Sequence, residues 1–191
     1  MNHRDTFKKV FKKELTEIND ESIRDFVLLC VELSCPDYFW TIPASQSGKY
    51  HSDISNGPGG LIRHTKLAFQ WAKELIRVWE LTVSQQDEVK AAVLLHDMMK
   101  LGTDCNSPPA RSTQIHGLLL VNNILSKLPK DFVLAPAQHS ILNAIASHMG
   151  RWTEPCLIGA TCVTSVVHLA DYVASRKIDH GDIVYDPKVQ V

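Results

Sequence analysis

The chain has 191 residues, 45% of them hydrophobic and 21% charged, which is the composition of a globular protein with one sizeable core. The 20 lysines and arginines balance 21 aspartates and glutamates, so no strong net charge draws the chain to nucleic acid or to a membrane surface. No apolar run approaches the ~20 residues that cross a bilayer, and the charged residues 1–13 are unlike a signal peptide, so we expect a cytoplasmic protein.

The N-terminal part predicts a pair of helices within residues 5–34. Apolar residues recur at helical spacing over 5–18, and Asp20 is placed to cap a second helix that Pro36 would stop. A local basic cluster lies in the first of them and fits a solvated helix face; it consists of Lys8, Lys9, Lys12 and Lys13. Residues 36–60 are rich in Gly, Pro and aromatic residues, and they form either a functional loop or a packed connector.

Helical apolar spacing continues through the rest of the chain. It predicts helices over about 61–81, 84–100, 113–128, 136–149 and 155–176, with Ser84 and Asp87 at capping-box spacing and an irregular tail over 180–191. No run of alternating strands appears. The fold class predicted is therefore all-α, a compact bundle of about seven helices, in a single domain over residues 1–191.

The cysteines are odd in number and scattered, with no Cys-x-x-Cys pair, which argues against a thiolate zinc site. They are Cys30, Cys35, Cys105, Cys156 and Cys162. Neutral thiols in a reducing compartment are the better interpretation.

A set of histidines and aspartates lies in five successive predicted helices, among apolar residues where a polar side chain needs a partner. The set is His64, His96, Asp97, His116, His148 and Asp171. A buried carboxylate is costly without a cation, which can be a metal ion or an Arg or Lys side chain. Imidazole and carboxylate together suit Mn, Fe, Co, Ni, Mg or Zn, and a carboxylate can bridge two ions whereas an imidazole cannot. Each residue alone is more often a core residue or an ion-pair partner, but the combination predicts a metal site.

The order of these residues and the short sequence motifs around them resemble the HD-domain superfamily of metal-dependent phosphohydrolases. The motifs are Gly59-Gly60-Leu61-Ile62-Arg63-His64-Thr65, Leu94-Leu95-His96-Asp97-Met98-Met99-Lys100, Ile145-Ala146-Ser147-His148-Met149-Gly150 and His168-Leu169-Ala170-Asp171. The resemblance covers about residues 50–176 and is nearest to the HD 3′-to-5′ exoribonuclease branch and small phage and bacterial HD proteins.

The resemblance implies one or two divalent metal ions and assigns their ligands. His64, His96, Asp97 and Asp171 would bind the first ion, and Asp97, His116 and His148 the second, with Asp97 as the bridge. Related two-metal members often have a second histidine where this chain has Met149, so the second ion could be bound less tightly or be absent. His168 is read as a residue behind the ligands.

Lys100 lies one helical turn after His96, and the resemblance gives it a contact with the substrate phosphate, so we assign a catalytic role to Lys100 and Asp97. Further candidates for substrate binding are His51, Arg63, Arg151 and Arg176. Tyr38, Trp40 and Tyr50 could stack on bases but fit packing roles better.

The activity expected is hydrolysis of phosphate esters of nucleotides or short single-stranded oligonucleotides by a metal-activated water. No residue can be assigned as the general acid. The alternatives are a di-iron oxygenase of the HD type and a catalytically weak nucleotide-binding sensor or decoy. No membrane partner is expected, and a homo-oligomer is compatible with the sequence.

Overall fold

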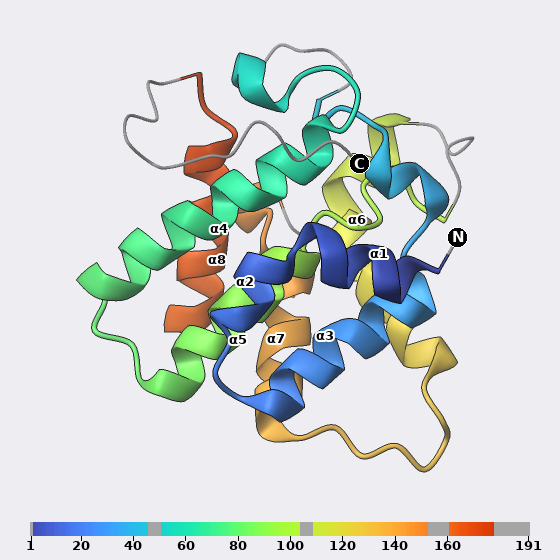
Figure 1. Ribbon diagram of the computed structural model, residues 1–191, viewed down its shortest axis with the longest axis vertical. Coiled ribbons are helices and arrows are strands. Elements are labelled where there is room, and N and C mark those ends of the chain that lie inside the picture. Colours follow the sequence, from blue (N-terminus) through green and yellow to red (C-terminus); the bar gives the residue numbers. More distant parts are fainter. Residues whose placement is uncertain (1, 46–50, 104–108, 153–160, 178–191) are drawn as a thin grey trace.

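The computed structural model describes residues 2–45, 51–103, 109–152 and 161–177. These residues form α-helices and short 3-10 helices and contain no strand, which confirms the all-α class (Figure 1). No helix in these four segments is long and apolar enough to span a membrane.

The N-terminal helices differ from the prediction by one break. The predicted helix over 5–18 is divided at Phe11, whose φ of −106° and ψ of 28° leave the helical range while its ring stays buried. Asp20 accepts hydrogen bonds from the backbone N–H groups of Ser22 and Ile23, as expected of an N-cap. The helices are α1 (His3–Val10), α2 (Lys12–Thr16) and α3 (Glu21–Ser34).

The connection from α3 to the next helix is a packed connector in its described parts. It contains two 3-10 helices, η1 (Asp37–Trp40) and η2 (Asp53–Ser55). Tyr38 and Trp40 are buried, and the Tyr38 hydroxyl donates to the carbonyl of Gly102 at 2.5 Å, so both rings have packing roles. Tyr50 lies outside the described residues.

The remaining helices are α4 (Gly60–Val78), α5 (Val83–Leu95), α6 (Pro109–Lys127), α7 (Pro136–Ser147) and α8 (Cys162–Ala174). The predicted capping box of α5 was wrong: Thr82 and Gln85 form it. Asp87 is instead buried and accepts hydrogen bonds from the backbone of Asn19 and Asp20, which ties α5 to the start of α3. The stretch 153–160 at the predicted start of the last helix and the tail 180–191 lie outside the described residues.

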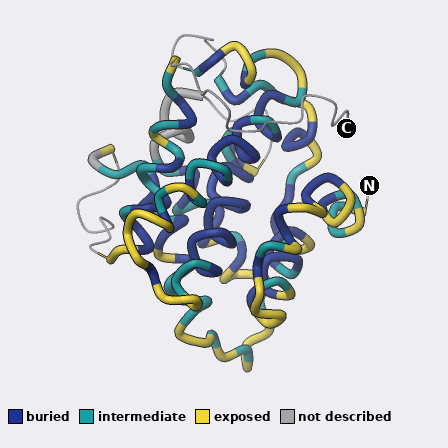
Figure 2. The backbone as a smooth tube through the Cα atoms, turned by 60° about the vertical axis from the view of Figure 1, so that its left-hand side comes forward, coloured by how far each residue is buried: buried dark blue, intermediate teal, exposed yellow. Residues whose placement is uncertain are grey.

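The centre of the bundle is α5, which is buried on every side from Asp87 onward, as the tube in Figure 2 illustrates with its dark-blue interior segments. It packs against α3, α4, α7 and α8. The helix ends at Leu95, earlier than predicted, and residues 96–101 continue as turns. His96 and Asp97 therefore emerge at the end of the most buried helix, where the backbone can direct two adjacent side chains into one space.

The start of α4 is fixed by a close contact with the preceding connector. A Cβ on Gly60 would lie 2.1 Å from the carbonyl oxygen of Ser55, so only glycine allows this approach. The contact sets the position of His64, which follows one turn into the helix.

Candidate metal centre

The six predicted ligands converge in the structure from five different helices or their ends. His64 comes from α4, the pair His96 and Asp97 from the end of α5, and His116 from α6. His148 is the C-cap of α7, and Asp171 lies in α8. All are buried apart from Asp171, whose side chain keeps 17% of its surface exposed. The fold thus brings together, in the core, side chains that lie up to about a hundred positions apart in the sequence.

The first group of ligand atoms surrounds one oxygen of Asp171 and one of Asp97. His64 Nε2 lies 3.0 Å from Asp171 Oδ1 and 3.5 Å from Asp97 Oδ2. His96 Nε2 lies 3.5 and 3.6 Å from the same two oxygens. All four ligand atoms lie within 4.8 Å of one another, a spacing that could hold one ion.

The second group shares Asp97 with the first. His116 Nε2 lies 2.6 Å from Asp97 Oδ1, and His148 Nε2 lies 3.7 Å from that oxygen and 2.9 Å from His116 Nε2. The two carboxylate oxygens of Asp97 therefore face different groups, Oδ2 the first and Oδ1 the second. The Asp97 carboxylate could therefore contact an ion in either group.

The hydrogen bonds around two of the histidines leave a lone pair aimed into the centre. His96 Nδ1 donates to the carbonyl of Val93 at 2.7 Å, and His148 Nδ1 donates to the carbonyl of Ile145 at 2.7 Å. A neutral imidazole that donates through Nδ1 presents an unprotonated Nε2. Among the described residues, the buried Nε2 of His96 has no hydrogen-bond partner, which suits a nitrogen that could bind a metal ion.

The electrostatics favour charged carboxylates at Asp97 and Asp171 and neutral imidazoles at His64 and His116, but not at His96. Burial works to raise the pKa values of Asp97 and Asp171, but Lys100 and His96 outweigh it at Asp97, and His64 and His96 outweigh it at Asp171; both pKa values fall well below the usual range. Burial lowers the pKa values of His64 and His116, whereas Asp97 raises the pKa of His96 against the effect of burial. Ionised carboxylates and neutral imidazoles are the forms that bind metal.

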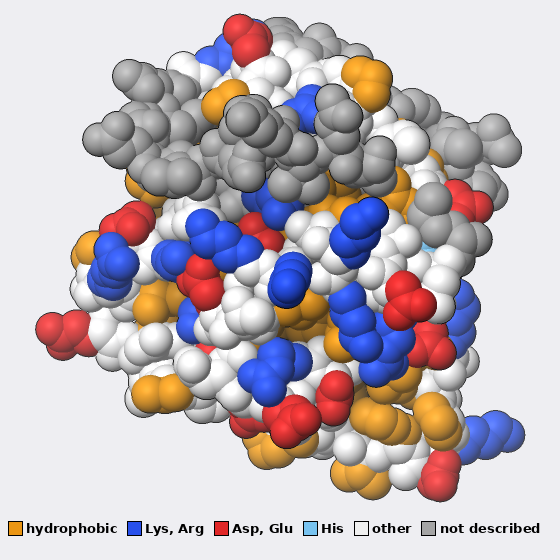
Figure 3. All heavy atoms as spheres, viewed as in Figure 1, with side chains coloured by type: hydrophobic (Ala, Val, Ile, Leu, Met, Phe, Trp, Pro, Cys, Tyr) orange, Lys and Arg blue, Asp and Glu red, His pale blue; other side chains and the backbone are white. Residues whose placement is uncertain are grey.

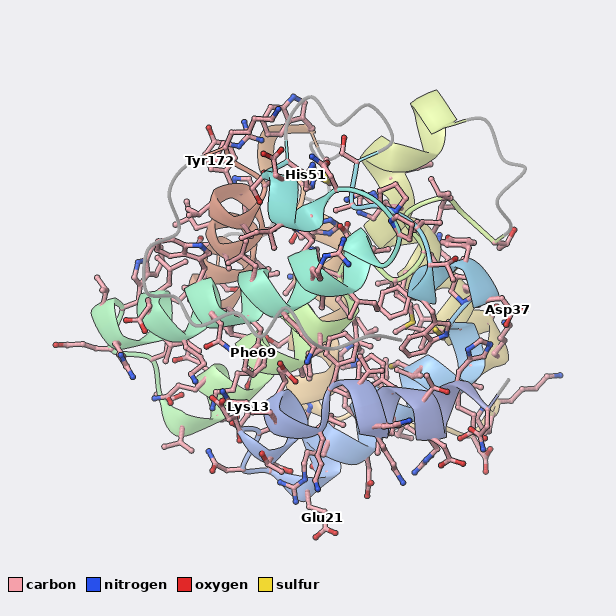
Figure 4. The ribbon with its side chains drawn as sticks, turned by 45° about the horizontal axis from the view of Figure 1, so that its top comes forward. Lys13, Glu21, Asp37, His51, Phe69 and Tyr172 are labelled. Carbon is pink, nitrogen blue, oxygen red and sulfur yellow. The ribbon has the colours of Figure 1, made fainter. Side chains whose placement is uncertain are left out.

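His51 lies beside this centre without belonging to either ligand group. Its ring meets the ring of His64 edge to face at a centroid distance of 5.0 Å. Both of its ring nitrogens are buried, and neither has a hydrogen-bond partner in the part of the chain that the structure describes. Burial and the neighbouring His64 lower its pKa to about 3, so the imidazole is neutral. Figure 4 shows His51 at the same end of the bundle as Tyr172, which lies next to Asp171 in α8.

We predict that the metal-free chain loses stability as the pH falls below about 6.5, partly through His51. In the unfolded chain His51 takes up a proton near pH 6.5, whereas in the folded chain it does so only near pH 3. Between these values, each pH unit of acidification lowers the free energy of unfolding by up to ~1.4 kcal/mol for such a group. The raised pKa of His96 opposes this in part. Urea unfolding between pH 7 and 4 should give a flatter dependence for His51→Gln than for wild type or for His139→Gln, a change at an exposed histidine. Equal slopes in all three proteins would contradict the placement of His51.

The other predicted substrate contacts fall in different places. Lys100 Nζ lies 2.5 Å from Asp97 Oδ2, so its charge is inside the cluster. The Arg63 guanidinium donates hydrogen bonds to the carbonyls of Ile54, Asn56 and Pro58. These bonds hold the connector around η2 against the start of α4. Arg176 lies after α8 and covers the ring of Tyr172 at 4.4 Å. The side chain of Arg151 lies outside the described residues.

His168 supports the ligands from behind, as expected. Its Nδ1 donates to the carbonyl of His148 at 2.7 Å. A Cβ on Gly150 would lie only 2.4 Å from the His168 ring, and Gly150 has a φ of +58°, so glycine is needed for this contact. Met149, which follows His148, is half-buried. The second group thus has two imidazoles and one carboxylate oxygen from this chain.

The three cysteines that the structure describes belong to neither ligand group. Cys30 and Cys35 are buried free thiols, and burial raises the pKa of Cys30 to about 12. Cys162 is exposed and free, while Cys105 and Cys156 lie outside the described residues. The ligand groups found among the described residues consist of histidine and aspartate.

Comparison with known proteins gives no match to a family model, a curated protein or a solved structure. The structure by itself defines an all-helical protein with a buried His–Asp cluster that could bind metal. The arrangement is compatible with an HD-like fold and with a metal-dependent enzyme.

Proposed function

We propose that the chain is a metal-dependent phosphohydrolase that cleaves phosphate esters of nucleotides or short oligonucleotides. The observation that carries the proposal is the division of the Asp97 carboxylate between two ligand groups, with Lys100 at its Oδ2. Paired ions about 3.5–4 Å apart are typical of enzymes that displace groups at phosphorus.

The roles of the side chains follow from their chemistry. Bound divalent ions would supply Lewis acidity and a water of lowered pKa. The four ligands of the first group would hold one ion, and Asp97, His116 and His148 would hold the other. The ammonium group of Lys100 would bind and neutralise the phosphoryl oxygens, because it is the one lysine that reaches the cluster among the described residues.

His51 is the second proposed contact with the substrate. A buried imidazole with no partner for either nitrogen costs roughly 1–3 kcal/mol for each unsatisfied atom. A neutral imidazole can donate through one nitrogen and accept through the other, so a phosphate or sugar hydroxyl of the substrate could satisfy it. Arg63 is not proposed for this role, since its donors are already engaged.

The proposal is tested by assaying the full-length chain, loaded in turn with Mn, Fe, Co, Ni, Mg and Zn, on nucleoside phosphates, dinucleotides and short oligonucleotides. Lys100→Gln should lower kcat/KM by ~100-fold or more, as expected when a charge-stabilising donor is removed, while metal content is retained. The matched control is Lys90→Gln, because Lys90 pairs with the buried Asp87 at the same i,i+3 spacing. The control should fold less stably and keep its kcat/KM.

Two outcomes would overturn the proposal. One is the absence of hydrolysis with every metal and substrate class, although the metal is bound. The other is oxygen-dependent turnover that requires iron, which would identify an oxygenase.

A further inference from the structure

A groove on the surface of the N-terminal helices is bordered by three cationic side chains, one apolar side chain and one hydroxyl. It has a volume of about 550 Å³ and is bordered by Lys8, Lys12, Leu15, Thr16 and Arg24. We call it the N-terminal groove. No carboxylate lines it, and it is a shallow groove open to solvent.

Two acidic residues close to the N-terminal groove in the sequence pair with α4 and do not line the groove. Glu14 is buried and pairs with Lys66 of α4 at 3.1 Å, and Glu17 pairs with Lys73 of α4 at 2.7 Å. Lys8 and Lys12 are exposed, and no ion pair to either is found within the described part of the chain. The balanced charge of the whole sequence therefore hides a separation of charges across α1 and α2.

Arg24 gives the groove a fixed charge. Its Nη1 donates to the carbonyls of Ile18 and Asn19, at 2.5 and 2.9 Å, which anchors the guanidinium against the α2–α3 turn. The remaining guanidinium nitrogens make no hydrogen bond to any described residue. An anchored guanidinium with a free edge is well suited to an oxyanion such as a phosphate.

The N-terminal groove is separate from the metal centre. Figure 4 shows Lys13 of α2 on one side of α4 and His51 on the other. Figure 3 shows lysine and arginine side chains gathered over the α1–α2 face. A ligand that contacted both places would have to be a polymer that passes around α4.

We propose that the N-terminal groove binds the phosphate backbone of single-stranded nucleic acid, as a contact distant from the metal centre. The inference rests on the proposed function, because it extends the substrate class from nucleotides to strands. Lys8 lies near the end of α1 and Lys12 begins α2, so the two exposed lysines stand on either side of the break at Phe11 and both border the groove. No aromatic side chain lines it, so it contacts phosphates and does not stack bases.

A membrane surface fits the N-terminal groove less well than a strand does. The large apolar residues of α1, Phe7 and Val10, are buried against the core. The helix thus has no apolar face left to insert into a bilayer.

The test measures binding of a labelled phosphorothioate oligothymidylate of about 20 nucleotides, longer than the ~4–16 that single-strand-binding domains cover, to the full-length metal-loaded chain. Fluorescence anisotropy is recorded over a range of salt concentrations. Lys8→Gln/Lys12→Gln should weaken binding by about tenfold or more, and should reduce the slope of log K against log salt by about 1.4, since each phosphate contact in a single strand contributes about 0.7. The control Arg77→Gln/Lys130→Gln removes two charges at exposed positions elsewhere and should leave both values unchanged.

Unchanged binding in the groove variant, or an equal loss in the control, would overturn the proposal. The proposal would also be overturned if the groove variant bound the strand as wild type does but had lost binding to polyglutamate or to phosphatidylserine vesicles. The phosphorothioate strand resists cleavage, so its binding is measured independently of hydrolysis. Failure to hydrolyse any substrate would therefore refute the proposed activity and leave the groove result standing.

Discussion

Asp97→Asn should abolish metal binding at both groups of ligands, and turnover with it. The amide keeps the shape of the side chain but removes the charge that both groups share, and it leaves Lys100 without its carboxylate. Loss of a residue that only hydrogen-bonds to a metal ligand lowers the affinity for the metal by ~10- to 100-fold. We expect a larger loss of affinity for divalent ions in Asp97→Asn. Isothermal titration of the metal-free protein, with elemental analysis of the loaded protein, measures the effect.

The matched control is Asp87→Asn. Asp87 is as deeply buried as Asp97, lies in α5 and pairs with a lysine three residues later, but it belongs to neither ligand group. It should lower the free energy of unfolding and keep the bound metal. Wild-type metal affinity in a folded Asp97→Asn protein would show that the cluster is an ion-pair network of the core.

Gly117→Ala should remove the second ion while sparing the first. A Cβ at this position would lie 2.2 Å from the carbonyl oxygen of Ile145 and 2.8 Å from His148 Nδ1. The backbone of α7 would have to move away from α6, and the hydrogen bond that orients His148 would break. We expect a loss of roughly 1–3 kcal/mol in stability from overpacking, and fewer ions per chain.

Thermal unfolding and metal counting of Gly117→Ala separate the two effects. Ser126→Ala, a change at an exposed position of the same helix, should behave as wild type in both. If Gly117→Ala binds as many ions as wild type, His148 is not a ligand.

The fold class and most helices could be predicted because apolar spacing reports burial directly. Helix α5 was predicted, but its capping residues were not. The Asp87 carboxylate accepts hydrogen bonds from the backbone N–H groups of Asn19 and Asp20 and does not cap its own helix. That contact joins residues 67 and 68 positions apart, and no local pattern reveals it. The break at Phe11 likewise depends on how the ring packs in the core.

The candidate site could be predicted as a set of residues but not as a geometry. Six polar residues in apolar surroundings, in an order that resembles a known family, predict the candidate ligands that the structure brings together. Sequence could not show that the two oxygens of Asp97 face different groups, nor that Arg63 is engaged by the connector while His51 is left with free nitrogens. Those facts depend on side-chain directions at the ends of separate helices, which the tertiary structure sets.

The most direct test of the central claim, that the His–Asp cluster binds metal, is X-ray absorption spectroscopy at the metal edge of the zinc-loaded protein. We predict nitrogen and oxygen ligands at about 2.0–2.2 Å, with the multiple-scattering pattern of imidazole and no sulfur at about 2.3 Å. A sulfur shell, or a protein that takes up no zinc, would contradict the assignment of the cluster as a metal centre.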